Sequence, residues 1–171
     1  MIKPSSRAFR ELLAGSSETI AGTVYGTIIV MATLVAGAPA FRDKLWNFFA
    51  VVVVTTLVFW AAHIYAHGLA ESLQLRRRLT VAELGQIAHR ERAIGLAAVL
   101  PALALVFGAL GAFEGSTAVW LALGLGVAAL AVQGVRYARL ERLSRAGTVT
   151  VVGLNLVLGL TIVILKVIVV H

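Results

Sequence analysis

Five long runs of apolar residues alternate along the chain with short polar segments that carry most of its charges. Each run is long enough to cross a hydrocarbon layer about 30 Å thick as a helix. The pattern therefore predicts an all-α integral membrane protein with five transmembrane helices in a single membrane domain, residues 1–171. The predicted spans cover about residues 17–38, 46–70, 93–111, 117–135 and 148–170.

A short amphipathic segment separates the second run from the third. Thr80 is followed three residues later by Glu83, the spacing of a capping box at a helix start. Apolar residues then recur on one side of the predicted helix, and polar residues fall on the other. We therefore expect a helix over residues 80–92 that lies at the membrane interface. We interpret His89 and Glu91 as part of its solvent-exposed face.

The basic residues predict the orientation of the chain. Twelve of the 15 lysines and arginines lie before the first run, between the second and third runs, or between the fourth and fifth runs. The other two connections hold only Arg42 and Lys44. Segments rich in lysine and arginine stay on the cytoplasmic side. We predict that the N-terminus is inside and the C-terminus outside.

The composition agrees with a membrane protein and excludes several kinds of chemistry. The chain is 60% hydrophobic and 13% charged, whereas soluble domains are nearer half and a quarter. Its net charge of +7 follows from the basic connections, so we expect no nucleic-acid partner. The absence of cysteine excludes disulfides, thiol catalysis and cysteine-ligated metals. The first run is too long for a signal peptide, so we expect it to be retained.

The first run carries a packing motif and a single carboxylate. Gly22 and Gly26 form a GxxxG pair, which lets another helix backbone approach closely. Together with other glycine-rich faces, this pair predicts a homo-oligomer. Glu18 lies near the start of the run, where it either stabilises the helix N-terminus or adds a carboxylate to a nearby site.

The second run carries the strongest candidate for a functional site. At about 100° per residue, five polar side chains fall within one narrow stripe of the predicted helix. A polar stripe that faces lipid is unfavourable, so it is expected to face other protein or a wet cavity. The residues of the stripe are Thr56, His63, His67, Glu71 and Gln74.

Two interpretations of the histidine pair remain open, and a third is disfavoured. The rings of His63 and His67 either make structural hydrogen bonds or handle a proton or a metal. Histidines at i and i+4 can bind one metal ion, and imidazole titrates near physiological pH. The hydrolytic motif HExxH requires glutamate directly after the first histidine, but this chain has Ile64 there. We therefore expect no enzyme.

Polar residues from several runs fall in the inner half of the predicted bundle, which suggests a shared vestibule. We expect Glu71 and Glu18 to attract a cation or complete its ligand shell. Thr56, Gln133 and Asn155 are expected to line the cavity. The inner-half residues are Glu18, His63, His67, Glu71, Gln133 and Asn155.

These observations predict a plasma-membrane transport protein or channel of the prokaryotic type that moves a small cation, either a proton or a divalent metal. The cofactor that the pattern allows is a divalent metal ion on His63 and His67. The expected partners are the lipid bilayer, anionic lipid at the inner surface and further copies of the chain. The alternative is a non-transporting membrane subunit whose basic inner surface binds a protein or anionic lipid.

Overall fold

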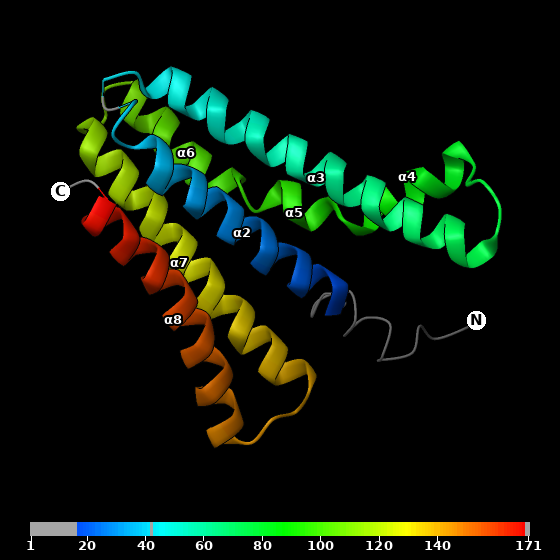
Figure 1. Ribbon diagram of the computed structural model, residues 1–171. Helices are drawn as coiled ribbons and strands as arrows, with labels where there is room; N and C mark the ends of the chain where they lie inside the picture. Colours follow the sequence, from blue (N-terminus) through cyan, green and yellow to red (C-terminus); the bar gives the residue numbers. More distant parts are fainter. Residues whose placement is uncertain (1–16, 42, 170–171) are drawn as a thin grey trace, which may run out of the picture.

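The computed structural model describes residues 17–41 and 43–169, and every element within them is a helix (Figure 1). The helices are α2 (Ser17–Gly37), α3 (Leu45–Leu75), α4 (Val81–Arg90), α5 (Arg92–Leu96), α6 (Val99–Ala109), α7 (Gly115–Leu140) and α8 (Arg145–Val169). Residues 1–16, position 42 and residues 170–171 lie outside the described part.

Five segments are long and apolar enough to cross a membrane, which confirms the predicted class of an all-helical membrane protein. They are Thr19–Gly37, Leu45–Leu75, Arg92–Ala109, Gly115–Leu140 and Arg145–Ile168. The second and fourth of these segments, α3 and α7, continue past the predicted ends at residues 70 and 135. Their last turns are polar, so hydropathy alone placed the ends too early.

The third span is broken in the middle. Helix α5 ends at Leu96 and α6 begins at Val99. Pro101 explains the break, because proline has no N–H to donate to the carbonyl four residues earlier, which belongs to Ala97. The ring of the proline also crowds that carbonyl. The third span therefore consists of two short helices.

The helices form two arms that diverge from a common end (Figure 1). The turn residues 38–41 and 43–44 lie together with the turn at residues 110–114 at the common end. One arm holds α3, α4 and α5, and the other holds α7 and α8. Helix α2 packs against α3, α5, α7 and α8, so it joins the two arms.

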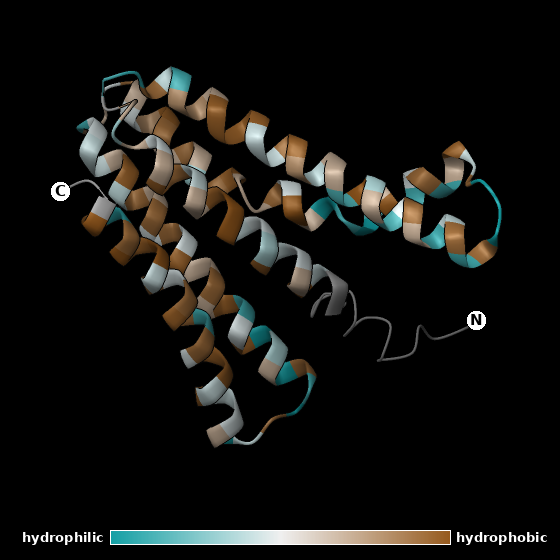
Figure 2. Cartoon of the chain, viewed as in Figure 1, coloured by the Kyte–Doolittle hydropathy of each residue, from teal (hydrophilic) through white to brown (hydrophobic). Residues whose placement is uncertain are grey.

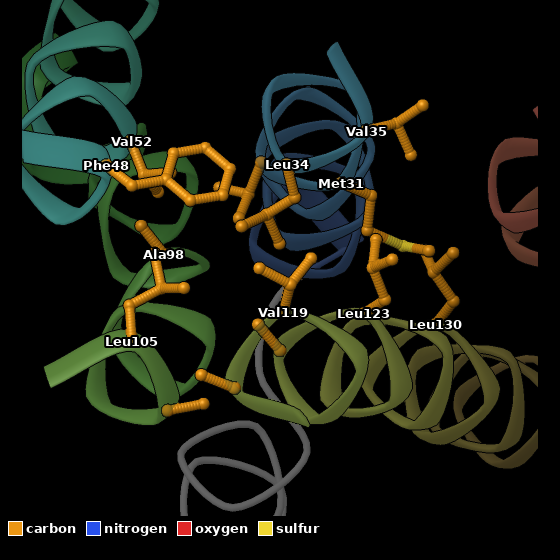
Figure 3. Packing of buried hydrophobic residues seen from close by; sticks show 14 residues of the cluster. Met31, Leu34, Val35, Phe48, Val52, Ala98, Leu105, Val119, Leu123 and Leu130 are labelled. Carbon is orange, nitrogen blue, oxygen red and sulfur yellow. The ribbon is translucent and has the colours of Figure 1, made fainter. Parts of the chain in front are cut away.

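The largest buried side chains gather between α2, α3, α6 and α7 (Figure 3). Met31, Leu34, Phe48, Leu105 and Leu123 are completely buried. Lipid tails are as apolar as these residues, so close packing holds membrane helices together more than the hydrophobic effect does. This core fixes α3 against α2 and therefore positions the polar stripe of α3.

Polar residues concentrate at the far ends of the two arms (Figure 2). One polar region covers the turn between α3 and α4, and the other covers the turn between α7 and α8. Arg76, Arg77 and Arg78 lie in the first turn, and Arg142 lies in the second. The charged ends of the arms are thus opposite the turns of the common end.

The GxxxG pair packs within the chain, against α5. A Cβ atom added to Gly26 would lie 2.5 Å from the carbonyl oxygen of Ile94 and 2.9 Å from its Cα. A Cβ atom on Gly22 would lie 3.3 Å from the Cβ of Ala93. These glycines therefore allow α2 and α5 to approach closely. Because this glycine pair packs against α5 of the same chain, it is not exposed for packing between chains there. The homo-oligomer remains a prediction.

Candidate metal centre

His63 and His67 project from the same face of α3, one helical turn apart. Their ring centroids are 4.4 Å apart, and the ring planes are nearly perpendicular at 81°. The ring of Tyr25 on α2 lies 5.4 Å from the ring of His63. The predicted stripe therefore faces α2 at the level of His63.

Glu91 lies between the two histidines, at the junction of α4 and α5. Its Oε1 atom is 3.0 Å from Nδ1 of His67, and its Oε2 atom is 3.4 Å from Nε2 of His63. Each carboxylate oxygen thus faces one imidazole. The Glu91 side chain is 14% exposed, compared with 30% for His63 and 52% for His67. The interpretation of Glu91 as solvent-exposed is therefore wrong.

A tight hairpin between α3 and α4 brings Glu91 back to the histidines. Helix α3 ends at Leu75, and its C-cap residue Arg76 has a left-handed backbone with a φ of 51°. The Ser72 hydroxyl donates a hydrogen bond of 2.7 Å to the Arg77 carbonyl. A Cβ atom on Gly68 would lie 3.0 Å from Leu84, so this glycine lets α4 pack closely on α3.

The predicted capping box is present at the start of α4. The backbone N–H of Thr80 donates to Glu83 Oε2 at 2.7 Å, and the N–H of Glu83 donates to the Thr80 hydroxyl at 3.3 Å. Arg77 donates to both carboxylate oxygens of Glu83, at 2.6 and 3.0 Å. These bonds from Arg77 and Thr80 lower the pKa of the Glu83 carboxyl to about 2, and the pair raises the pKa of Arg77.

We expect the Glu83 carboxyl to titrate far below an ordinary glutamate. Its folded pKa is depressed, so its contribution to hairpin stability is present above the ordinary value of 4.5. That contribution disappears as the pH falls toward 2. A carbon-detected NMR titration of Glu83 measures the midpoint directly. Arg77→Gln should raise the midpoint, whereas Arg76→Gln should leave it unchanged; equal midpoints in all three proteins would contradict the ion pair.

The three side chains form a set of donors suited to a metal ion. One donor atom from each of His63, His67 and Glu91 lies within 4.8 Å of the others. Ligands of a tetrahedral zinc ion, at bonds of 2.0–2.2 Å, are separated by about 3.4 Å. Small side-chain rotations therefore suffice to bring the three donors to one ion. Three protein ligands leave at least one coordination position open.

An open cavity of about 430 Å³ adjoins this cluster. Glu71 and Gln74 line it from α3, so the structure places Glu71 beside the histidine–glutamate cluster and outside the set of three donors. The cavity gives water and ions access to His67 and Glu91. Its lining residues are His67, Ala70, Glu71, Gln74, Ile87, Arg90 and Glu91.

The first residue of the predicted stripe has a different environment. Thr56 is buried, and its hydroxyl donates to the carbonyl of Val52 at 2.8 Å. It lines a separate cavity of about 330 Å³ between α3 and the α5–α6 segment, whose other walls are apolar. Glu18 belongs to α2, but its side chain lies outside the described residues.

Gln133 and Asn155 lie on α7 and α8, in the other arm. Gln133 is buried, and its Oε1 accepts a hydrogen bond of 3.4 Å from Arg136. Asn155 donates to the carbonyl of Val151 at 3.2 Å and lies against Gly134. The arms diverge (Figure 1), so these two amides belong to the α7–α8 contact and not to the cluster on α3.

Together, the described residues define an all-helical protein with five potential membrane-spanning helices and a cluster of two histidines and one glutamate at the end of the second span. Comparisons with protein-family models, with curated proteins and with solved structures found no match. The function must therefore be argued from the cluster itself.

Proposed function

We propose that this protein is a membrane transport protein that moves a divalent transition-metal ion, with His63, His67 and Glu91 as the binding site. The observation that carries the proposal is the convergence of two imidazoles and one carboxylate within 4.8 Å. Imidazole nitrogen suits zinc, iron, nickel and copper, whereas magnesium and calcium prefer sites made only of oxygen.

An open site favours movement of the ion over permanent storage. Structural zinc sites are usually closed by four protein ligands. This cluster offers three, His67 is half exposed, and the cavity beside it holds a second carboxylate, Glu71. An ion can therefore enter from water, exchange ligands and leave. Glu71 would attract the cation to the cavity before it reaches the histidines.

The depth of the cluster also fits an entrance. Trp46 and Tyr65 are both exposed on α3 and stand 19 residues apart, a rise of about 28 Å in a helix. Aromatic side chains of this kind mark the two edges of the hydrocarbon layer. His63 and His67 flank Tyr65, so the cluster would lie at the edge of the membrane that faces the arginine-rich turns.

The predicted orientation of the chain would put this entrance on the cytoplasmic side of the membrane. The excess of arginines at the ends of the arms supports an N-terminus inside, a C-terminus outside and a cytoplasmic cluster, in a plasma membrane of the prokaryotic type. Helix α4 would lie at the inner interface. A reporter fused after His171 should read outside; an inside reading would contradict this orientation.

Zinc transport by the purified full-length protein tests the proposal. Liposomes that contain the protein and a zinc-sensitive dye should take up zinc faster than empty liposomes, and magnesium should not compete. Proton flux that needs no metal would favour the proton as the transported ion. Zinc binding without any flux would favour the non-transporting subunit. Neither binding nor flux would contradict both the site and its function.

A further inference from the structure

A groove separate from the two cavities described above lies between α3 and α4, on the side of α3 that faces away from the histidines. It has a volume of about 240 Å³. Its apolar wall consists of Tyr65, Leu69 and Leu84, which are 71%, 50% and 38% exposed. Gly68, Ser72 and Leu79 also line it, and Arg78 is its one charged lining residue. The groove is therefore mainly apolar and carries a single cation from the turn between α3 and α4.

Arg78 differs from its neighbour Arg77 in its partners. Arg77 is engaged by both oxygens of Glu83. In the part of the chain that the structure describes, the ion pairs found do not include Arg78 or Arg76. Arg78 is exposed, so its guanidinium is available to an anion at the mouth of the groove. A guanidinium binds phosphate oxygens through paired hydrogen bonds.

The depth of the groove matches the boundary between lipid tails and headgroups. Tyr65 stands one hydrocarbon thickness from Trp46, as argued above. Ser72, which also lines the groove, lies seven residues beyond Tyr65, or about 10 Å along the helix. The headgroup layer is about 5–8 Å thick on each side of the membrane, so the groove would extend from the hydrocarbon edge at Tyr65 across this layer.

We infer that this groove binds one phospholipid of net negative charge, with its phosphate on Arg78, its glycerol backbone and ester groups along Leu69 and Leu84, and the first part of an acyl chain against Tyr65. The phosphate group is common to anionic and zwitterionic lipids. However, Arg78 would repel the ammonium group of a zwitterionic headgroup. The geometry therefore favours a headgroup without a cation, such as that of phosphatidylglycerol. This inference does not depend on the metal site, because it uses another face of α3.

Native mass spectrometry of the detergent-purified full-length protein tests the inference. Phosphatidylglycerol and phosphatidylcholine with identical acyl chains are titrated separately. Phosphatidylglycerol should bind more tightly, with one lipid retained per chain. Arg78→Gln should weaken its binding about fivefold, the effect of one arginine near a membrane surface. Leu69→Ser, at a half-exposed position where folding should survive, should weaken it a few-fold through lost apolar contact.

Arg139→Gln is the matched control, because it removes an equal charge from an exposed position on the other arm. It should leave the retained lipid unchanged. If Arg139→Gln and Arg78→Gln weaken binding equally, general surface charge attracts the lipid and the groove is not a site. Equal binding of the two lipids would also overturn the inference. Full displacement of the bound lipid by inorganic phosphate would also overturn the inference, since the proposed ligand is held by its acyl chain as well.

Discussion

Gly26→Ala is expected to destabilise the protein strongly, although alanine is normally the better helix former. The added Cβ atom would lie 2.5 Å from the Ile94 carbonyl oxygen and 2.9 Å from the Cα of Ile94. Both are backbone atoms, so no side-chain rotation can relieve the clash. Overpacking of this kind typically costs about 1–3 kcal/mol. The thermal midpoint in detergent should fall by several degrees.

Gly124→Ala provides the matched control, because no heavy atom lies within 4 Å of a Cβ atom added there. It should be neutral or slightly stabilising, since alanine is favoured over glycine in a helix by about 1 kcal/mol. Gly22→Ala, with a nearest contact of 3.3 Å, should fall between the two. Equal thermal midpoints for Gly26→Ala and Gly124→Ala would show that α2 and α5 do not pack as described.

The second large effect is expected at Glu91. Glu91→Gln keeps the size of the side chain but removes the anionic ligand that faces both imidazoles. Loss of an outer-sphere partner alone weakens a metal site 10–100-fold, so loss of a direct ligand should exceed about a hundredfold. Zinc affinity should fall by that amount, and zinc uptake into liposomes should fall to background. His63→Ala and His67→Ala should have similar effects.

Two matched variants separate a specific site from general charge. His89→Ala removes an exposed imidazole of α4 that is absent from the donor set, so zinc affinity should stay unchanged. Glu71→Gln removes the second carboxylate of the cavity and should slow zinc entry more than it weakens zinc binding. If Glu71→Gln abolishes binding while Glu91→Gln does not, the third ligand is misassigned.

The apolar runs sufficed to predict the class of fold, because a helix that crosses lipid must satisfy its own backbone and hide few charges. The spacing of His63 and His67 likewise predicted that both rings share one face of α3. The helix ends were less predictable. Polar turns extend α3 to Leu75 and α7 to Leu140, where hydropathy gives no signal.

Glu91 was missed because its local pattern is that of an exposed helix face. The signal lay in the hairpin: His67 stands eight residues before the end of α3, and Glu91 stands ten residues after the start of α4. The stretches of helix on the two sides of the turn are similar in length and run antiparallel, so their far ends return to about the same level. The capping box at Thr80 and Glu83 marked the turn, so this register was available from the sequence.

Two residues of the expected vestibule, Gln133 and Asn155, lie away from the histidine cluster for a different reason. Depth along a membrane helix follows from position in the sequence, but the lateral neighbours of a side chain depend on how the helices pack. Gln133 and Asn155 share an approximate depth with the histidines by counting, yet they lie on the other arm. Equal depth is therefore a weak argument for a shared site.

Zinc content and zinc coordination of the purified protein test the central claim most directly. After equilibrium dialysis, elemental analysis should give one zinc per chain, and X-ray absorption should show two imidazole ligands and a nitrogen–oxygen shell at about 2.0–2.2 Å. The double variant His63→Ala, Glu91→Gln should retain no zinc, while His89→Ala retains one. A parent protein without stoichiometric zinc, or a double variant with the same zinc spectrum, would contradict the metal centre.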